Sequence, residues 1–198
     1  MRLTSLTVPA LPGHAFRALL AFLLGAAFVP LLAAESKADL EFFQATTVEA
    51  EKGGAVAQCA LGACYESGHG VSVDYVAAVK WYSKSAKQGD ALAQCALGAC
   101  YEKGRGVAKD LNEAVKWYAK SAAQGCPPGQ YDLATCYVKG HGLPKDYVEA
   151  YKWYSLAAAK DYAPARKALP ALERRMTPAR LAEARRFPVA PVPEEKTK

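Results

Sequence analysis

The sequence predicts an all-α fold, a right-handed α/α solenoid of helix-turn-helix repeats with capping helices at both ends. The three tryptophans, Trp81, Trp117 and Trp153, follow one another at a step of 36 residues. Segments 55–90 and 91–126 are identical at about 25 of 36 positions. A fixed period of this length, in segments rich in Ala and Leu and broken by glycines, is typical of stacked helical hairpins.

Residues 1–34 form the first predicted element, an export signal peptide. Basic residues precede an apolar stretch over 18–34, and no acidic residue occurs before Glu35. This order is typical of a signal that is cleaved, which predicts a periplasmic or secreted protein. The alternative is an uncleaved N-terminal membrane anchor, although Gly25 and Pro30 would interrupt it.

An N-terminal capping helix is expected over residues 35–54. This segment lies where the second helix of a preceding copy would lie. It lacks tryptophan and is richer in acidic residues, as a polar end of a repeat array should be.

Three full copies follow, over residues 55–90, 91–126 and 127–162. In the first copy, residues 55–66 favour a helix, which Gly68 and Gly70 should end in the left-handed conformation. Asp74 is expected to cap a second helix that runs to about Gln88. Each copy is therefore predicted to be a helix-turn-helix.

The second helices carry two further signals. Glu113 follows Asp110 by three residues and Glu149 follows Asp146 in the same way, which is the spacing of a capping box. Four residues at helical spacing should form the buried stripe of the first copy: Ala78, Trp81, Tyr82 and Ala86. Because one hairpin cannot cover its own apolar face, the copies are expected to stack on one another.

The C-terminal capping helices are predicted over residues 163–187. Thr177 should cap the last of them, which Pro178 opens at the position where proline is best tolerated. Three prolines and a charged end predict a disordered tail over 188–198.

Composition and motifs exclude several classes of function. The formal net charge is +6, or +4 once Arg2 and Arg17 leave with the signal, which is too small to indicate a nucleic-acid partner. The chain has no Ser-x-x-Lys, no Gly-x-Ser-x-Gly and no phosphate-binding loop. His69 and His141 are expected to be exposed turn residues two copies apart. We therefore expect no enzyme, no cofactor and no bound metal.

The six cysteines leave one candidate disulfide. Cys59 and Cys64 are five residues apart on one helix, which places them too far apart to bridge. Cys126 ends the second copy, and an antiparallel hairpin returns its end to the start of its own first helix, near Cys95. Cys95 and Cys126 are the candidate pair, and the alternative is that all six thiols are small buried hydrophobic groups.

The pattern AxAQxxLGxxYxxGxGVxxDxxxAxxWYxKSAxQG, written from the first two copies, resembles the Sel-1-like repeat. This family is a branch of the tetratricopeptide-type solenoids, and the resemblance covers residues 39–187. It implies a protein-binding scaffold. The cysteine-rich branch of the family implies a hydrolase as a weaker alternative, but its intra-repeat bridges do not transfer, because no second helix here contains a cysteine. Ala60 and Ala96 stand where the family commonly has asparagine.

The expected function is a non-enzymatic protein–protein interaction scaffold that acts outside the cytoplasm. Outward positions of the first helices differ between copies and are the candidate partner-binding residues: Val56, Leu92 and Pro128, and Ser67, Lys103 and Lys139. Neutral substitution at solvent-exposed positions explains their variation equally well. The alternative function is an envelope-associated structural protein that binds acidic polymer or lipid through the basic C-terminal helix, which carries Arg185 and Arg186.

Overall fold

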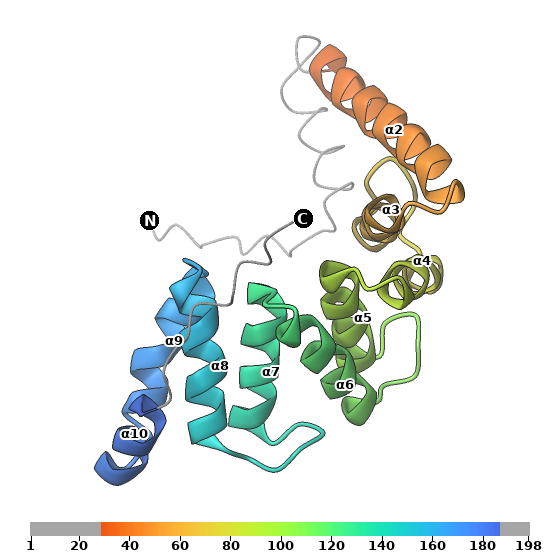
Figure 1. The fold of residues 1–198 in the computed structure, drawn as a ribbon. Helices are drawn as coiled ribbons and strands as arrows, with labels where there is room; N and C mark the ends of the chain where they lie inside the picture. The colour runs from red at the N-terminus through yellow and green to blue at the C-terminus, as the bar shows by residue number, and fades with distance from the viewer. Residues whose placement is uncertain (1–28, 187–198) are drawn as a thin grey trace, which may run out of the picture.

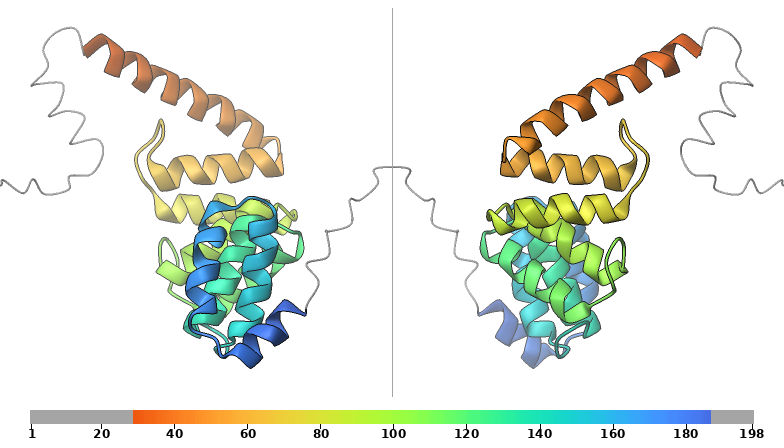
Figure 2. Two further views of the ribbon diagram at one scale, coloured as in Figure 1. Left: turned by 90° about the vertical axis from the view of Figure 1, so that its left-hand side faces the viewer. Right: turned by 90° about the vertical axis from the view of Figure 1, so that its right-hand side faces the viewer.

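The protein is a curved stack of helices, with α2 at one end and α9 and α10 at the other (Figures 1 and 2). The structure, a computed structural model, describes residues 29–186. Within that range there are nine helices and no strands: α2 (Val29–Glu51), α3 (Ala55–Ser67), α4 (Tyr75–Lys87), α5 (Ala91–Lys103), α6 (Leu111–Ala123), α7 (Pro127–Lys139), α8 (Tyr147–Ala159), α9 (Ala163–Glu173) and α10 (Pro178–Arg185). Each helix packs mainly on the next one, and α10 returns to α8. The predicted all-α solenoid is confirmed.

The N-terminal helix α2 begins at Val29, six residues before the predicted start at 35. It therefore runs through the predicted cleavage point at Ala34. Pro30 does not prevent this, because proline is tolerated in the first turn of a helix. Residues 1–28 of the predicted signal and the predicted tail at 188–198 lie outside the described residues. No helix between 29 and 186 has both the length and the apolar character that a membrane span requires.

Turns and caps explain where the paired helices begin and end. The first helices α3, α5 and α7 end at Gly68, Gly104 and Gly140, which have positive φ angles of 77°, 67° and 73°. Each glycine N–H donates to the carbonyl four residues earlier. The second helices begin at aspartates whose carboxylates accept two backbone N–H groups each: Asp74, Asp110 and Asp146.

Only one of the two hydrogen bonds of each predicted capping box forms. The Asp110 carboxylate accepts from the N–H of Glu113 at 3.0 Å, as expected. The glutamate does not return the bond, because the Asp110 N–H already donates to the carbonyl of Tyr101. Glu113 contacts Lys116 at 3.0 Å instead, one turn along the helix. In each copy the N–H of the capping aspartate, which a capping box would pair with the glutamate, donates instead to a carbonyl of the first helix.

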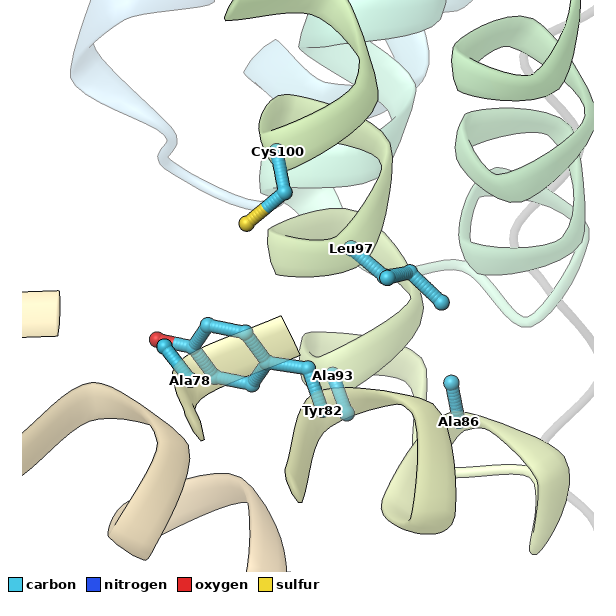
Figure 3. Close-up of a cluster of buried hydrophobic side chains, with 6 residues drawn as sticks. All are labelled: Ala78, Tyr82, Ala86, Ala93, Leu97 and Cys100. Atoms are coloured by element: carbon cyan, nitrogen blue, oxygen red, sulfur yellow. The ribbon is translucent and has the colours of Figure 1, made fainter. Parts of the chain in front are cut away.

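The core lies between successive helices and is built from small residues and tyrosines (Figure 3). The ring of Tyr82 lies over Gly62, where an added Cβ would approach the ring to 2.7 Å, and Tyr118 lies over Gly98 in the same way. The predicted buried stripe is correct for Ala78, Tyr82 and Ala86 but not for Trp81. Trp81 is half-buried, and the Lys84 ammonium lies 3.9 Å from the centroid of its ring.

A ladder of glutamines joins one copy to the next. Gln94 is buried, and its amide nitrogen donates to the carbonyl of Ala86 at the end of the preceding copy. Its amide oxygen accepts from Gln124 at 2.8 Å, and the same Gln124 nitrogen donates to the carbonyl of Gly89. Gln58 and Gln88 repeat this arrangement in the first copy. Both polar atoms of each buried amide are thus satisfied.

The third copy lacks one part of this ladder. Lys160 replaces the last glutamine, and its ammonium donates to the carbonyl of Gly125 at 2.7 Å. The buried amide oxygen of Gln130 finds no hydrogen-bond partner within residues 29–186. A buried carbonyl oxygen without a partner costs about 1–3 kcal/mol.

We expect Lys160→Gln to raise the free energy of unfolding by about 1 kcal/mol, because the new amide can donate to both Gln130 and Gly125. Urea unfolding at neutral pH measures the change. The reverse exchange in the second copy, Gln124→Lys, is the matched control and should cost a similar amount. A Lys160→Gln protein no more stable than the parent would contradict this assignment.

Candidate functional site

The outward face of the first helices forms one continuous row, which we call the first-helix stripe. Its members recur at steps of four, three and four residues, which keeps them on one face of each helix. They are Val56, Ala60, Ala63 and Ser67 in α3, Leu92, Ala96, Ala99 and Lys103 in α5, and Pro128, Asp132, Thr135 and Lys139 in α7. All of them are exposed or half-buried, whereas Leu61, Leu97 and Leu133 point into the core. The stack brings all the predicted partner-binding residues onto this face.

The N-terminal end of the stripe is apolar and exposed. Val56 is 75% exposed and Leu92 is 58% exposed, each in the first turn of its helix. Pro128 occupies the equivalent place in α7 and is half-buried. Covering a valine or leucine side chain gains about 1.5–3 kcal/mol, so these residues can contribute to binding another molecule.

The C-terminal end of the stripe is basic. Lys103 and Lys139 are exposed in the last turns of α5 and α7. Ser67, their equivalent in α3, is also exposed, but its hydroxyl donates to the carbonyl of Ala63 at 2.8 Å. The charge therefore belongs to the second and third copies. A helix rise of 1.5 Å per residue separates the apolar and basic ends by about 16 Å.

A groove extends the apolar end of the stripe onto α2. Its volume is about 790 Å³, and Phe42, Thr46 and Glu49 from α2 face Val56 and Ala60 from α3 across it. The Phe42 side chain is half-exposed. Sequence reasoning did not select Phe42, although an exposed aromatic residue in a capping helix was the signal available.

Asp132 places a carboxylate in the middle of the stripe, where the first two copies have Ala60 and Ala96. The Cys95 thiol donates to its Oδ2 at 3.3 Å. Burial raises the pKa of Asp132 from 3.8 to about 6, and Glu102 adds to the rise. The Cys95 bond and two lysines act in the opposite direction. The charge on this surface therefore changes between pH 5 and 7.

The cysteines are six free thiols in the structure. Desolvation is the largest cause that raises the pKa of Cys59 and of Cys136 to about 12, and that of Cys100 to about 11. Cys95 and Cys126 are each 8% exposed, against 2–3% for Cys64, Cys100 and Cys136. Within residues 29–186, no three His, Cys, Asp or Glu side chains gather in a way that could hold a metal ion.

The two predicted turn histidines are not simple exposed residues. His69 Nε2 lies 3.4 Å from a carboxylate oxygen of Asp39, and His141 Nδ1 lies 3.4 Å from one of Glu102. In both cases the carboxylate belongs to the preceding copy or cap. Glu102 also accepts from the Tyr118 hydroxyl at 2.9 Å. The first-copy turn therefore contacts the N-terminal cap, and the third-copy turn contacts the second copy.

Several arginines of the basic C-terminal cluster make contacts within the chain. Four of its arginines bond to acidic or phenolic groups: Arg166 to Asp161 at 2.8 Å, Arg175 to the Tyr147 hydroxyl at 2.7 Å, Arg180 to Asp146 at 3.8 Å, and Arg185 to Glu173 at 2.9 Å. These contacts hold α9 and α10 against α8. They give the arginines a structural role in capping the stack.

Comparisons with known proteins agree with this geometry. A family model described as Sel1 repeat matches residues 55–90, 91–126 and 127–162. One similar solved structure is a protective antigen present in uropathogenic Escherichia coli strains that displays an SLR fold. It is 34% identical with a TM-score of 0.68, and the match covers 72% of this chain and 31% of that one.

A second similar structure is a Sel1 repeat protein from Oxalobacter formigenes. It is 36% identical with a TM-score of 0.60, and the match covers 73% of this chain and 59% of that one. The chain thus spans about a third of the first of these proteins and about three-fifths of the second. A search of curated proteins found no match.

Proposed function

This chain belongs to the Sel1 repeat family, and from that premise we propose that it is a non-enzymatic scaffold that binds another protein through the first-helix stripe. Solenoids of this kind present extended curved surfaces, and their function depends on what those surfaces hold. The proposal gives the chain no catalytic step. Its partner is a protein with an apolar segment that can cover the N-terminal end of the stripe.

The exposure of Val56 and Leu92 is the observation that carries the proposal. Two large aliphatic side chains at equivalent places on α3 and α5 remain 75% and 58% exposed. The groove beside Val56 continues this apolar surface onto Phe42. Contiguous apolar surface of this kind is typical of a protein-interaction site.

We also propose that the chain acts outside the cytoplasm. The support is the composition of residues 1–34, which have a basic start, an apolar middle and small residues before Glu35. The mass of the protein purified from its host tests this proposal. A chain that retains residues 1–34 and is recovered with the cytoplasm would contradict it.

The double variant Val56→Asp with Leu92→Asp tests the binding surface. We expect at least tenfold weaker capture of the partner, because charges would replace two aliphatic side chains that the partner is proposed to cover. The measurement is quantitative recovery after crosslinking in the native host. Circular dichroism should remain that of the parent, because both side chains lie outside the core.

Val76→Asp is the matched control, because Val76 is 67% exposed but lies on the second helix α4. It should leave capture unchanged. Equal loss in the control and the double variant would contradict the assignment to this face. Salt-sensitive loss on replacing Arg185 and Arg186, with no loss in the double variant, would favour the alternative of an acidic polymer or lipid partner.

A further inference from the structure

The repeat itself places two cysteines against each other. Cys126 ends the second copy where Asp90 ends the first, and Cys95 stands in the second copy where Cys59 stands in the first, each at the step of 36. Asp90 caps α5, and its carboxylate lies close enough to the Cys59 thiol to add, by charge and hydrogen bonding, to the rise in the pKa of that thiol that burial causes. By the same geometry, Cys126 at the start of α7 faces Cys95 in the second turn of α5.

Two hydrogen bonds from side chains to backbone carbonyls fix this approach. Gln124 donates to the carbonyl of Gly89, which holds the turn before α7 against the start of α5. The Ser121 hydroxyl donates to the carbonyl of Ala91 at 2.6 Å at the same junction. Helices α5 and α7 are also in direct contact. The segment that leads into Cys126 is therefore held against the start of α5, which carries Cys95.

The side chains agree with this placement. Asp90 uses its carboxylate to cap α5, with the Ala93 N–H donating at 2.7 Å. Cys126 is the equivalent N-cap residue of α7, but its side chain makes no capping hydrogen bond within the part of the chain that the structure describes. Burial and Asp132 are the main causes that raise the pKa of Cys95, and proximity to Cys126 adds to the rise. The Cys126 sulfur is thus close to Cys95 and makes no capping hydrogen bond to α7.

We propose that Cys95 and Cys126 are a redox pair that forms a disulfide between α5 and the start of α7 when the chain meets a small-molecule disulfide. One cysteine thiolate attacks the reagent, which forms a mixed disulfide and releases one reagent thiolate. The second cysteine thiolate then attacks the protein sulfur of the mixed disulfide and releases the other reagent thiolate. Two cysteine thiols are oxidised and one reagent disulfide is reduced to two thiols, because the two released reagent thiolates take up, through solvent, the two protons that the cysteines lose.

The bridge would change the charge on the first-helix stripe. The Cys95 thiol donates to Asp132, and this bond favours the carboxylate form. A disulfide sulfur has no proton to donate, so the pKa of Asp132 should rise further above about 6 on oxidation. The pair therefore couples the redox state to the protonation of a residue on the proposed binding face.

The test is oxidation of the full chain with oxidised glutathione at pH 8, followed by thiol counting and peptide mapping. The count of free thiols should fall from the six present in the structure to about four, and one peptide should join Cys95 to Cys126. The reaction should accelerate with pH, because the thiolate is the attacking species and burial raises the pKa of Cys95. The oxidised protein should melt roughly 5 °C higher, since the bridge closes a loop in the unfolded chain.

Two serine variants make the test specific. Cys126→Ser should fold, because serine is a good N-cap, and it should form no bridge. Cys59→Ser removes the nearby third thiol and should still bridge fully. A chain that keeps six thiols, stops at a glutathione adduct, or joins Cys59 to either partner would overturn the proposal.

Discussion

Replacing Gly106 with alanine is expected to lower the free energy of unfolding by about 3–5 kcal/mol, the largest effect we predict for a single methyl group. Gly106 lies in the turn after α5 with a φ angle of 70°. A Cβ at this position would collide with the carbonyl oxygen of Tyr75, the first residue of α4 in the preceding copy. Backbone at a helix start cannot move aside as a side chain tip can.

Equivalent glycines make the same kind of contact elsewhere in the stack, so we expect the substitution to weaken the junction between two copies. Gly70 would meet the carbonyl of Asp39, and Gly142 would meet that of Leu111. Gly106 and Gly142 let the turn of one copy lie directly on a helix start of the copy before, and Gly70 lets the first turn lie on the middle of α2. Urea unfolding should therefore show a lower midpoint and a smaller slope if the copies on either side of Gly106 come apart separately.

Gly89→Ala is the matched control, because it isolates the cost of the backbone angle. Gly89 has a φ angle of 97°, and an added Cβ would find no atom within 4 Å. We expect a loss of about 1–2 kcal/mol from the left-handed conformation alone. Equal losses for the two variants would show that the contact with Tyr75 contributes nothing.

The repeat step predicted these turns but not what they touch. A period of 36 and the glycines after each first helix were enough to place α3 to α8 to within about two residues. Left-handed glycines and aspartate caps are local features, so one copy of the sequence specifies them. The contact of Gly106 with Tyr75 joins residues 31 positions apart in the chain. A local sequence pattern therefore cannot predict it.

The third copy shows a second limit of the repeat. Ala134 replaces the glycine under the tyrosine ring, and Val138 replaces the glutamate that accepts from Tyr82 and Tyr118 in the earlier copies. The Tyr154 hydroxyl lies 2.9 Å from that of Thr135 instead. The tyrosine keeps its place in the repeat, but its hydroxyl contacts a threonine one turn earlier in the first helix and not a glutamate. Alignment of the copies therefore predicts where the tyrosine ring lies, but not which residue its hydroxyl contacts.

The candidate site was predictable in part for the same reason. The outward positions of the first helices follow from helical spacing, and the structure exposes Val56 and Leu92 as that spacing requires. The groove beside Phe42 depends on the angle between α2 and α3, which the sequence does not specify. The role of Asp132 depends on its burial beside Cys95, a contact between two copies.

Replacing Asp132 with asparagine is expected to stabilise the reduced protein at pH 7 by about 2–3 kcal/mol and to have little effect at pH 4. Burial is the largest cause of the rise in the pKa of Asp132 from 3.8 to about 6. A carboxyl group with a raised pKa in the folded state stabilises the fold while it is protonated, below pH 4. That contribution is lost as the pH rises through about 6, because the folded state must then hold a buried charge.

Asparagine has nearly the same shape and carries no charge at any pH. Its amide oxygen can still accept from the Cys95 thiol, which donates to Asp132 at 3.3 Å in the parent. The difference between 3.8 and about 6 corresponds to roughly 3 kcal/mol, which sets the upper end of the expected gain. Urea unfolding at pH 4, 5, 6 and 7, in the presence of reductant, measures the gain at each step.

Asp110→Asn provides the matched control, because Asp110 is an exposed helix cap and asparagine caps a helix equally well. Its stability relative to the parent should change little across the same pH range. The opposite result for Asp132→Asn, a protein less stable than the parent at pH 7, would mean that Lys103 and Lys139 stabilise the carboxylate more than burial penalises it. The stripe would then keep its negative charge below pH 6 as well, and a partner would have to supply a donor or a cation to cover it.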